Sequence, residues 1–217
     1  VVIVLSLVMT ISAWQFSKYQ IETRTGARFE AERDRVIGLI ETRLHKYEDL
    51  LWSSASAVES HDGAITREQW KIFGRNLRIE DKYSGISALG VVHHVSRADL
   101  PAFTAERRRE RPDLTVRPPH DEPVHLVLTY ITPEEGSAKA IGFDLANEAN
   151  RLDALLASRD SGEARITGPI EVRRDSGPVP GFLFAVPFYD GVVPATVEAR
   201  RDGVLGFIAA SFATRKL

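Results

Sequence analysis

The chain opens on an apolar run that carries no charge. Residues 1–14 read VVIVLSLVMTISAW, and Trp14 closes the run. A helix that spans a bilayer needs about 20 apolar residues, and an aromatic residue is typical of the membrane interface. We therefore expect residues 1–16 to be the end of a transmembrane helix in a longer protein. A buried core helix and the apolar part of a signal peptide are the alternatives.

A polar segment with apolar residues at helical spacing follows. Residues 17–60 contain no Pro, and most larger apolar residues recur at intervals of 3, 4 or 7. These apolar positions are Phe29, Val36, Ile40, Leu44, Tyr47, Leu51 and Val58. The pattern predicts one long helix, a stalk over residues 17–62. Its apolar face either pairs with a second copy as a parallel dimer or packs on its own domain.

Beyond the stalk the pattern changes to short helices and strands. Thr66 with Gln69 forms a capping box before a helix that carries Trp70. Another helix is predicted over 147–160, residues 178–181 are predicted as a hairpin loop, and 193–202 as an irregular polar connection. Strands are predicted over 86–95, 124–132, 139–143, 165–167, 170–174, 182–189 and 204–212. The sum is an α+β fold with a mostly antiparallel sheet.

Composition narrows the class of function. The 217 residues contain 28 Lys and Arg against 30 Asp and Glu, so the formal net charge is -2. A near-neutral chain lacks the basic footprint of a nucleic-acid-binding protein. The chain has no Cys, which excludes disulfides, cysteine zinc sites and a thiol nucleophile.

The histidines do not follow a known metal-binding pattern. His93 and His94 are neighbours on a predicted strand, so they face opposite sides and are expected to be structural. His120 and His125 flank Asp121 and Glu122, but this spacing matches no standard zinc motif. We predict no metal site and no cofactor.

Catalytic motifs are also missing from the sequence. Ser158 and Ser161 lie near Asp160, but there is no G-x-S-x-G elbow, and neither nucleotide-binding glycine motif occurs. The basic run 107–111 is expected to be a solvated helix end. We therefore expect no enzyme activity in this segment.

Aromatic residues concentrate on the later strands. Together with a few small polar residues they suit either a pocket for a small amphipathic ligand or an ordinary core. The set is Tyr130, Phe143, Thr167, Phe182, Phe184, Phe188 and Tyr189.

Several of these stretches together resemble the CHASE domain, an extracytoplasmic sensor of membrane receptors. The resemblance covers roughly residues 65–212 and rests on the order and spacing of its blocks. They are 130–136 (YITPEEG), 140–145 (AIGFDL), 165–170 (RITGPI), 181–189 (GFLFAVPFY) and 206–209 (GFIA). It implies a sensor domain over 63–212, built from two PAS-like subdomains with antiparallel sheets. The distal part would span about 66–175, and the proximal part about 176–213 plus the stalk.

The resemblance also suggests site residues. Cytokinin-binding members of the family hold the adenine ring through an acidic residue near the start of a distal strand. Asp121 is the candidate here, with Glu122 or His125 as alternatives. The other ligand-binding candidates are Tyr130, Phe143, Thr167 and Phe184.

The resulting expectation is a sensor in the inner membrane with its domain in the periplasm or outside the cell. It would bind a small organic ligand, cytokinin-like in the family's best-known case, and signal through the membrane to a histidine kinase or diguanylate cyclase. The N-terminal helix would contact membrane lipid, the stalk would form a homodimer, and no nucleic acid would bind. The alternative is a dimerisation or protein-docking module without a small-molecule ligand.

Overall fold

The computed structural model describes residues 2–61 and 63–213. The chain forms two compact units, Val1–Lys46 and Tyr47–Leu217. The first unit consists of the N-terminal part of helix α1 (Val2–Glu59). All of the sheet and the remaining helices belong to the second unit.

Helix α1 confirms the helix predicted over residues 17–62 as far as Glu59 and continues it towards the N-terminus. Its apolar stripe has two environments. Tyr47, Leu51 and Val58 are at most 3% exposed, whereas Val36 and Ile40 are 46% and 54% exposed. Within residues 2–61 and 63–213, no helix has an apolar stretch long enough to cross a bilayer. The transmembrane helix end over 1–16 is therefore not confirmed, and Val1 lies outside the described residues.

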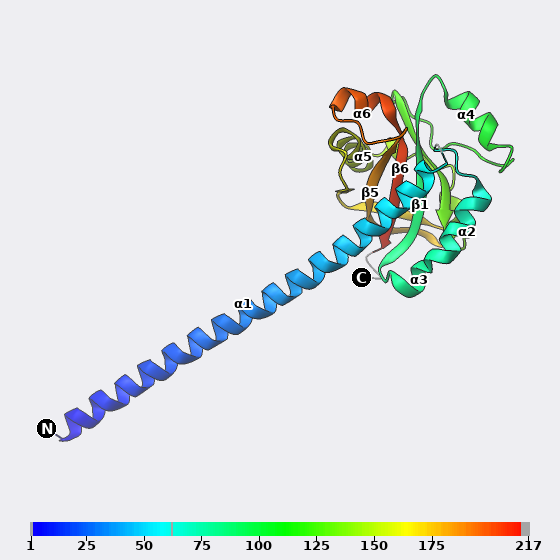
Figure 1. Cartoon of the computed structure of the whole chain (residues 1–217). Helices are drawn as coiled ribbons and strands as arrows, with labels where there is room; N and C mark the ends of the chain where they lie inside the picture. The colour runs from blue at the N-terminus through cyan, green and yellow to red at the C-terminus, as the bar shows by residue number, and fades with distance from the viewer. Residues whose placement is uncertain (1, 62, 214–217) are drawn as a thin grey trace. The chain divides into compact units, whose positions relative to one another are not determined.

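Within its described residues, the second unit combines short helices with six strands, and Figure 1 shows their arrangement. Its α-helices after α1 are α2 (Arg67–Leu77), α3 (Ile79–Lys82), α4 (Leu100–Arg107), α5 (Ala149–Ser161) and α6 (Val197–Gly203). Two 3-10 turns are η1 (Ala138–Ala140) and η2 (Leu145–Asn147). The strands are β1 (Ile86–Ser96), β2 (Val124–Thr132), β3 (Arg165–Ile166), β4 (Ile170–Arg174), β5 (Gly177–Tyr189) and β6 (Val204–Ala213).

All strands join one antiparallel sheet, in the order β2-β1-β6-β5-β3, with β4 paired to β5. This confirms the mixed helix and antiparallel-sheet class. The division into a distal part over 66–175 and a proximal part over 176–213 is not confirmed. Strand β1, from the first of these parts, pairs over Ile86–His93 with β6 from the second, so both parts contribute to one sheet.

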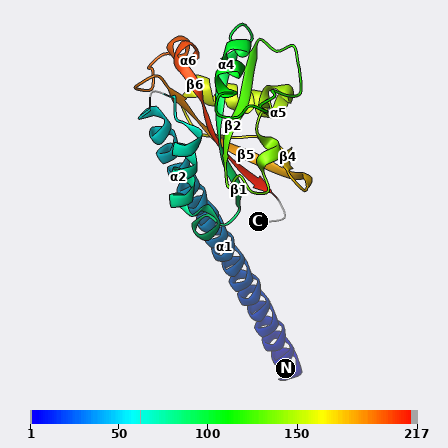
Figure 2. The same ribbon diagram turned by 90° about the vertical axis from the view of Figure 1, so that its right-hand side faces the viewer.

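Each face of the sheet is covered by helices. On one face Val92, Leu126 and Phe207 pack with Leu155 of α5 in a buried cluster. On the other face the aromatic ring of Tyr47, near the end of α1, lies 5.1 Å from that of Phe212. Helix α2 is on the opposite side of the sheet from α5 (Figure 2).

A β-bulge in β2 decides which residues face which side. Val91 pairs with Tyr130 but Val92 pairs with Leu128, so Thr129 is an extra residue in β2. The alternation of a regular strand is therefore broken after Leu128. Tyr130 leaves the α5 side, which Leu128 faces, and turns towards the α2 side.

Two predicted local structures are wrong. Residues 139–143 do not form a strand, because the chain makes η1 and then Gly142 adopts a φ of +80°, which interrupts an extended backbone. Residues 178–181 are not a loop but part of β5, and the turn lies at Asp175 and Ser176. Pro178 and Pro180 are tolerated because β5 pairs with β6 only from Gly181 onward, so one side of this segment is an edge.

The polar connection over 193–202 is also more ordered than predicted. It contains α6, whose N-terminus is capped by the Thr196 hydroxyl accepting a hydrogen bond from the Ala199 amide, 3.2 Å away. The capping box at Thr66 and Gln69 is confirmed, with both reciprocal hydrogen bonds present.

Gly74 allows α2 to approach β2 closely, and this contact can be tested. A Cβ on Gly74 would lie 2.2 Å from the Thr132 hydroxyl oxygen and 2.6 Å from its Cβ. Gly74→Ala should therefore lower the free energy of unfolding by about 1–2 kcal/mol, despite the better helix propensity of Ala. Urea denaturation measures this change. Gly38→Ala is the control, since nothing lies within 4 Å of its Cβ, and it should cause no loss. A Gly74→Ala protein as stable as the parent would contradict the close approach.

Candidate functional site

A cleft between α2 and the end of β2 combines aromatic walls with charged groups. Its volume is about 390 Å³, which lies in the range of about 300–1,000 Å³ typical of small-molecule sites. Trp70 and Gly74 line it from α2, and Tyr130, Thr132 and Glu134 line it from β2 and the turn that follows. The bulge at Thr129 gives the cleft its tyrosine, because without it Tyr130 would face α5.

Tyr130 connects the cleft to helix α4. Its hydroxyl donates to a Glu110 carboxylate oxygen at 2.8 Å and accepts from the Arg107 guanidinium at 3.0 Å. Burial raises the pKa of the Tyr130 phenol to about 12, although the charge of Arg107 opposes this shift. The phenol therefore stays neutral at physiological pH and keeps a proton to donate.

Glu134 is the central charge of the cleft. It forms ion pairs with Arg67, at 3.0 Å, and with Arg111. Burial alone would raise the pKa of the Glu134 carboxyl, but the hydrogen bonds and charges of Arg111 and Arg67 together lower it. The ionised carboxylate thus holds the start of α2 and the end of the basic run against the turn after β2.

The α2 wall offers groups that can meet a ligand. Trp70 is 2% exposed, and its indole N–H has no hydrogen-bond partner among the described residues. Lys71 and Arg75 are exposed at the cleft, and neither forms an ion pair within the part of the chain that the structure describes. The arrangement can accept a small molecule with a flat apolar part and a negative group.

The structure brings one of the five predicted site residues into this cleft, namely Tyr130. Asp121 is fully exposed and lies 3.6 Å from the Arg97 guanidinium. Phe143 faces two guanidinium groups, Arg151 at 5.2 Å and Arg173 at 4.4 Å from the ring centroid, and lines surface cavities of about 420 and 470 Å³.

The remaining two candidates are buried in the sheet. The Thr167 hydroxyl accepts a hydrogen bond from the Leu183 amide at 3.0 Å, and Phe184 is 5% exposed on β5. The five residues do not form one site. Their ligand-binding roles stay predictions.

The sequence did not indicate Arg67, Arg111 or Glu134 as site residues. The expectation that the basic run 107–111 is a solvated helix end is wrong for two of its members. The side chains of Arg107 and Arg111 are only 12% and 19% exposed, because they pair with Tyr130 and Glu134. Two features of the sequence could have indicated this site, namely the basic run 107–111 and the two acidic residues of the Pro-Glu-Glu-Gly turn.

His93 and His94 lie on opposite faces of β1, as predicted. His93 forms a 2.8 Å hydrogen bond between its Nδ1 and the Thr129 hydroxyl, and its ring lies 6.3 Å from that of Tyr130. Burial, assisted by the charge of Arg107, lowers the pKa of His93 to about 3. Burial and the charge of Arg159 lower the pKa of His94 to about 4. Both rings are therefore neutral at pH 7.

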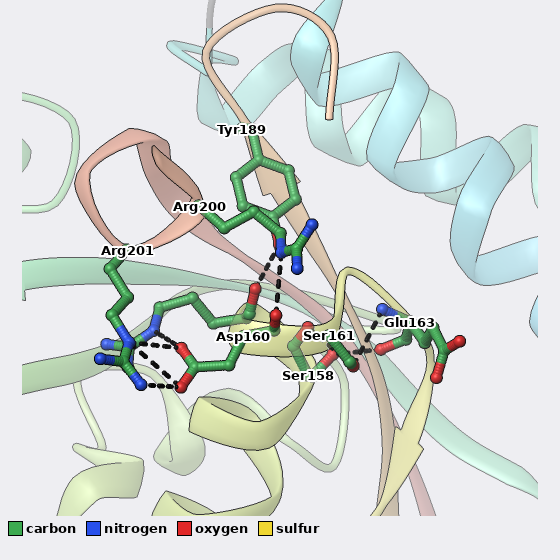
Figure 3. Close-up of polar contacts among 8 residues, drawn as sticks. Ser158, Asp160, Ser161, Glu163, Tyr189, Arg200 and Arg201 are labelled. Atoms are coloured by element: carbon green, nitrogen blue, oxygen red, sulfur yellow. Dashed lines mark hydrogen bonds and ion pairs between the residues drawn. The ribbon is translucent and has the colours of Figure 1, made fainter. Parts of the chain in front are cut away.

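The serines near Asp160 have structural roles (Figure 3). The Ser158 hydroxyl donates to the Glu163 carbonyl oxygen at 2.7 Å, and the Ser161 hydroxyl lies 3.4 Å from the Ser158 carbonyl oxygen that it donates to. Asp160 binds Arg201 at 2.5 Å, which ties α6 to the end of α5. These contacts stabilise the ends of helices, and none of them activates a hydroxyl group.

One group of side chains has atoms placed to bind a metal ion. Among the described residues, nitrogen or oxygen atoms of His120, His125 and Asp144 lie within 4.8 Å of one another. None of the three residues lines the α2–β2 cleft.

Comparisons with known proteins give a family and one structural likeness. A family model described as "CHASE domain" matches residues 63–217. No curated protein matches the chain. Among solved structures, the chain is similar to the crystal structure of the periplasmic sensory domain of the Campylobacter jejuni chemoreceptor Tlp1, with 15% identity and a TM-score of 0.36. The match covers 81% of this chain and 58% of that chain, so this chain spans less than two thirds of its length.

The buried histidines give a testable pH dependence. An unfolded histidine has a pKa of about 6.5, so below that pH the unfolded chain binds protons that folded His93 does not bind. The contribution of neutral His93 to the free energy of unfolding is complete above pH 6.5 and is lost as pH falls towards about 3. Between pH 7 and pH 5, His93 should reduce the free energy of unfolding by about 2 kcal/mol.

Urea denaturation at the two pH values measures this loss. His93→Gln should show a pH dependence smaller by that amount, whatever its absolute stability. His45→Gln, at an exposed position on α1, is the control and should behave like the parent. An unchanged pH dependence in His93→Gln would show that His93 does not stay neutral in the folded protein.

Proposed function

The chain belongs to the CHASE domain family, and from this we propose that it is the ligand-binding part of an extracytoplasmic sensor in a membrane receptor. The family is sensory and not catalytic, so we assign no reaction to this segment. The α2–β2 cleft is the proposed ligand site. The observation that carries this assignment is the combination in one cleft of Trp70, with an unpartnered N–H, and Glu134, held by two arginines.

The charges around the cleft suggest the class of ligand. Lys71 and Arg75 have no ion pair among the described residues, whereas Glu134 is already neutralised by Arg67 and Arg111. A small organic anion would therefore find cations that are still available. Its flat apolar part would pack against Trp70 and Tyr130. An adenine-type ligand, as in the cytokinin-binding members of the family, is the alternative chemistry.

Signalling requires that the ligand favour one state of the receptor. A ligand shifts an equilibrium only by its differential affinity for the two states. The cleft lies between a helix and a strand, so a bound ligand can change how closely α2 sits on β2. We propose that this change passes through α1 and a membrane segment to a cytoplasmic histidine kinase or diguanylate cyclase.

Ligand binding can be measured through Trp70. The chain has three Trp residues, so Trp14→Phe with Trp52→Phe leaves Trp70 as the single indole. A panel of dicarboxylates, amino acids and adenine derivatives should include an anion that changes Trp70 fluorescence saturably. The same compound should raise the melting temperature, because binding to the folded state alone stabilises it by RT ln(1 + [L]/Kd).

Charge reversal on the cleft wall is the specificity control. Lys71→Glu with Arg75→Glu should weaken binding at least about tenfold, the effect of about 1.4 kcal/mol. Arg35→Glu, at an exposed position on α1, should leave binding unchanged. If no compound binds, or if charge reversal has no effect, the cleft is not the sensor site. The first of these results would favour the protein-docking alternative.

A homodimer through α1 is the second part of the proposal. Four large apolar residues within residues 36–40 of the first unit are exposed by 45–63%, and an isolated helix cannot bury them itself. They are Val36, Ile37, Leu39 and Ile40. A second copy of the same helix would cover them with a matching apolar face.

Sedimentation of the full chain tests the dimer. We expect a dimer for the parent and a monomer for Ile40→Asp, because a charge at the helix seam loses its hydration on association. Thr42→Asp introduces the same charge on an exposed position away from the seam and should remain dimeric. A monomeric parent, or a dimeric Ile40→Asp, would refute association through this face.

A further inference from the structure

Asp144 is a carboxylate held rigidly inside the protein. It is 0% exposed and lies at the start of η2. One of its oxygens, Oδ1, accepts hydrogen bonds from the Leu126 amide at 2.9 Å and the Ala146 amide at 3.1 Å. These two backbone donors fix the plane of the carboxylate and leave Oδ2 for other partners.

Two imidazole rings converge on that second oxygen. His125 Nδ1 lies 2.6 Å from Asp144 Oδ2, and His120 Nε2 lies 2.9 Å from it. The side chains of His120 and His125 are only 10% and 6% exposed. Their ring centroids are 4.6 Å apart. Asp144 Oδ2 therefore lies close to two imidazole nitrogens, one from each of two neighbouring rings.

His120 Nε2 is not satisfied by this contact. It is buried, and it makes no hydrogen bond within the described residues, although Asp144 Oδ2 is near. The direction of its N–H therefore passes beside the oxygen. This off-axis arrangement suits a metal ion about 2.0 Å from each ligand atom, which would sit beside the line that joins the nitrogen and the oxygen.

We propose that His120, His125 and Asp144 bind one divalent transition-metal ion. Two imidazoles and one carboxylate form a ligand set for Zn²⁺, and other borderline divalent metals accept the same donors. Tetrahedral Zn²⁺ requires ligand atoms about 3.3 Å apart. The separations of 2.6 and 2.9 Å need only small outward shifts. Solvent completes the coordination.

The backbone around the site supplies outer-shell support. The Leu126 and Ala146 amides hold Asp144, as outer-shell donors do for metal-binding carboxylates. Arg97 donates to the carbonyl oxygens of His120 and Glu122, at 3.3 and 2.9 Å, and so holds the backbone of the loop that carries His120. A bound ion would join this loop to the start of β2 and to η2.

One contact must change when the metal binds. The Glu122 amide donates to His120 Nδ1 at 3.2 Å. A neutral imidazole that ligates through Nε2 carries its proton on Nδ1, so the Glu122 amide must then turn away. Glu122 is exposed in the loop before β2, and its rearrangement does not disturb the core. We therefore expect micromolar affinity and not the tighter binding of a fully prearranged site.

The test is direct metal titration of the full chain after chelator treatment. Calorimetry with Zn²⁺ should give one site per chain, and Co²⁺ should show the visible absorption of a low-symmetry site with nitrogen ligands. His120→Gln and His125→Gln should each weaken Zn²⁺ binding at least about tenfold. His45→Gln, an exposed histidine on α1, is the matched control and should bind like the parent.

His120→Gln is the decisive variant, because His120 lies in a loop and its replacement leaves the hydrogen bonds of Asp144 to the backbone intact. The parent and His120→Gln should have similar melting temperatures without metal, and Zn²⁺ should raise only that of the parent. The proposal is overturned if the parent does not bind Zn²⁺ with one-to-one stoichiometry. It is equally overturned if His120→Gln binds as tightly as the parent.

Discussion

The extra residue at Thr129 in β2 is the constraint on which the α2–β2 cleft depends. Before it, Leu126 and Leu128 face α5 and the buried cluster there. After it, Tyr130 and Thr132 face α2. Strict alternation would instead put Tyr130 on the α5 side with Leu126 and Leu128, so the bulge brings its hydroxyl to the α2 side.

The two ends of β2 hold different chemistry. On the α2 side, the His93 ring bonds to Thr129 itself and packs near Tyr130, whose hydroxyl leads to Arg107 and Glu110. Near the start of the strand, the Leu126 amide next to His125 supports the Asp144 carboxylate. The proposed ligand cleft and the proposed metal site thus lie near the two ends of the same strand, and no side chain belongs to both.

Much of the fold could be predicted from the sequence because its signals are local. The capping box at Thr66, the β-branched residues of 86–95 and the helical spacing of Tyr47, Leu51 and Val58 are each signals from a few neighbouring residues. The bulge could not be predicted, because Thr129 and Tyr130 are acceptable on either face of a sheet. Likewise Pro178 and Pro180 indicate a loop, unless it is known that this part of β5 pairs with β4 on one side and with no strand of the described residues on the other.

The candidate site was harder to predict because its members are distant in sequence. Arg67 and Arg111 meet at Glu134 only through the packing of α2 and the segment after α4 against the end of β2. Read locally, the run around Arg111 is a solvated helix end. Asp144 likewise follows His125 by many residues, so no spacing motif connects them, whereas membership of the CHASE family was evident from ordered sequence blocks.

The central claim is that a ligand enters between α2 and the end of β2, and backbone amide NMR of the full chain measures this most directly. The compound selected by Trp70 fluorescence would be titrated into labelled protein. The account predicts that the largest shift changes fall on residues 67–77 and 129–135. Changes concentrated instead around Phe143 and Arg173, on the other face of the sheet, would contradict it.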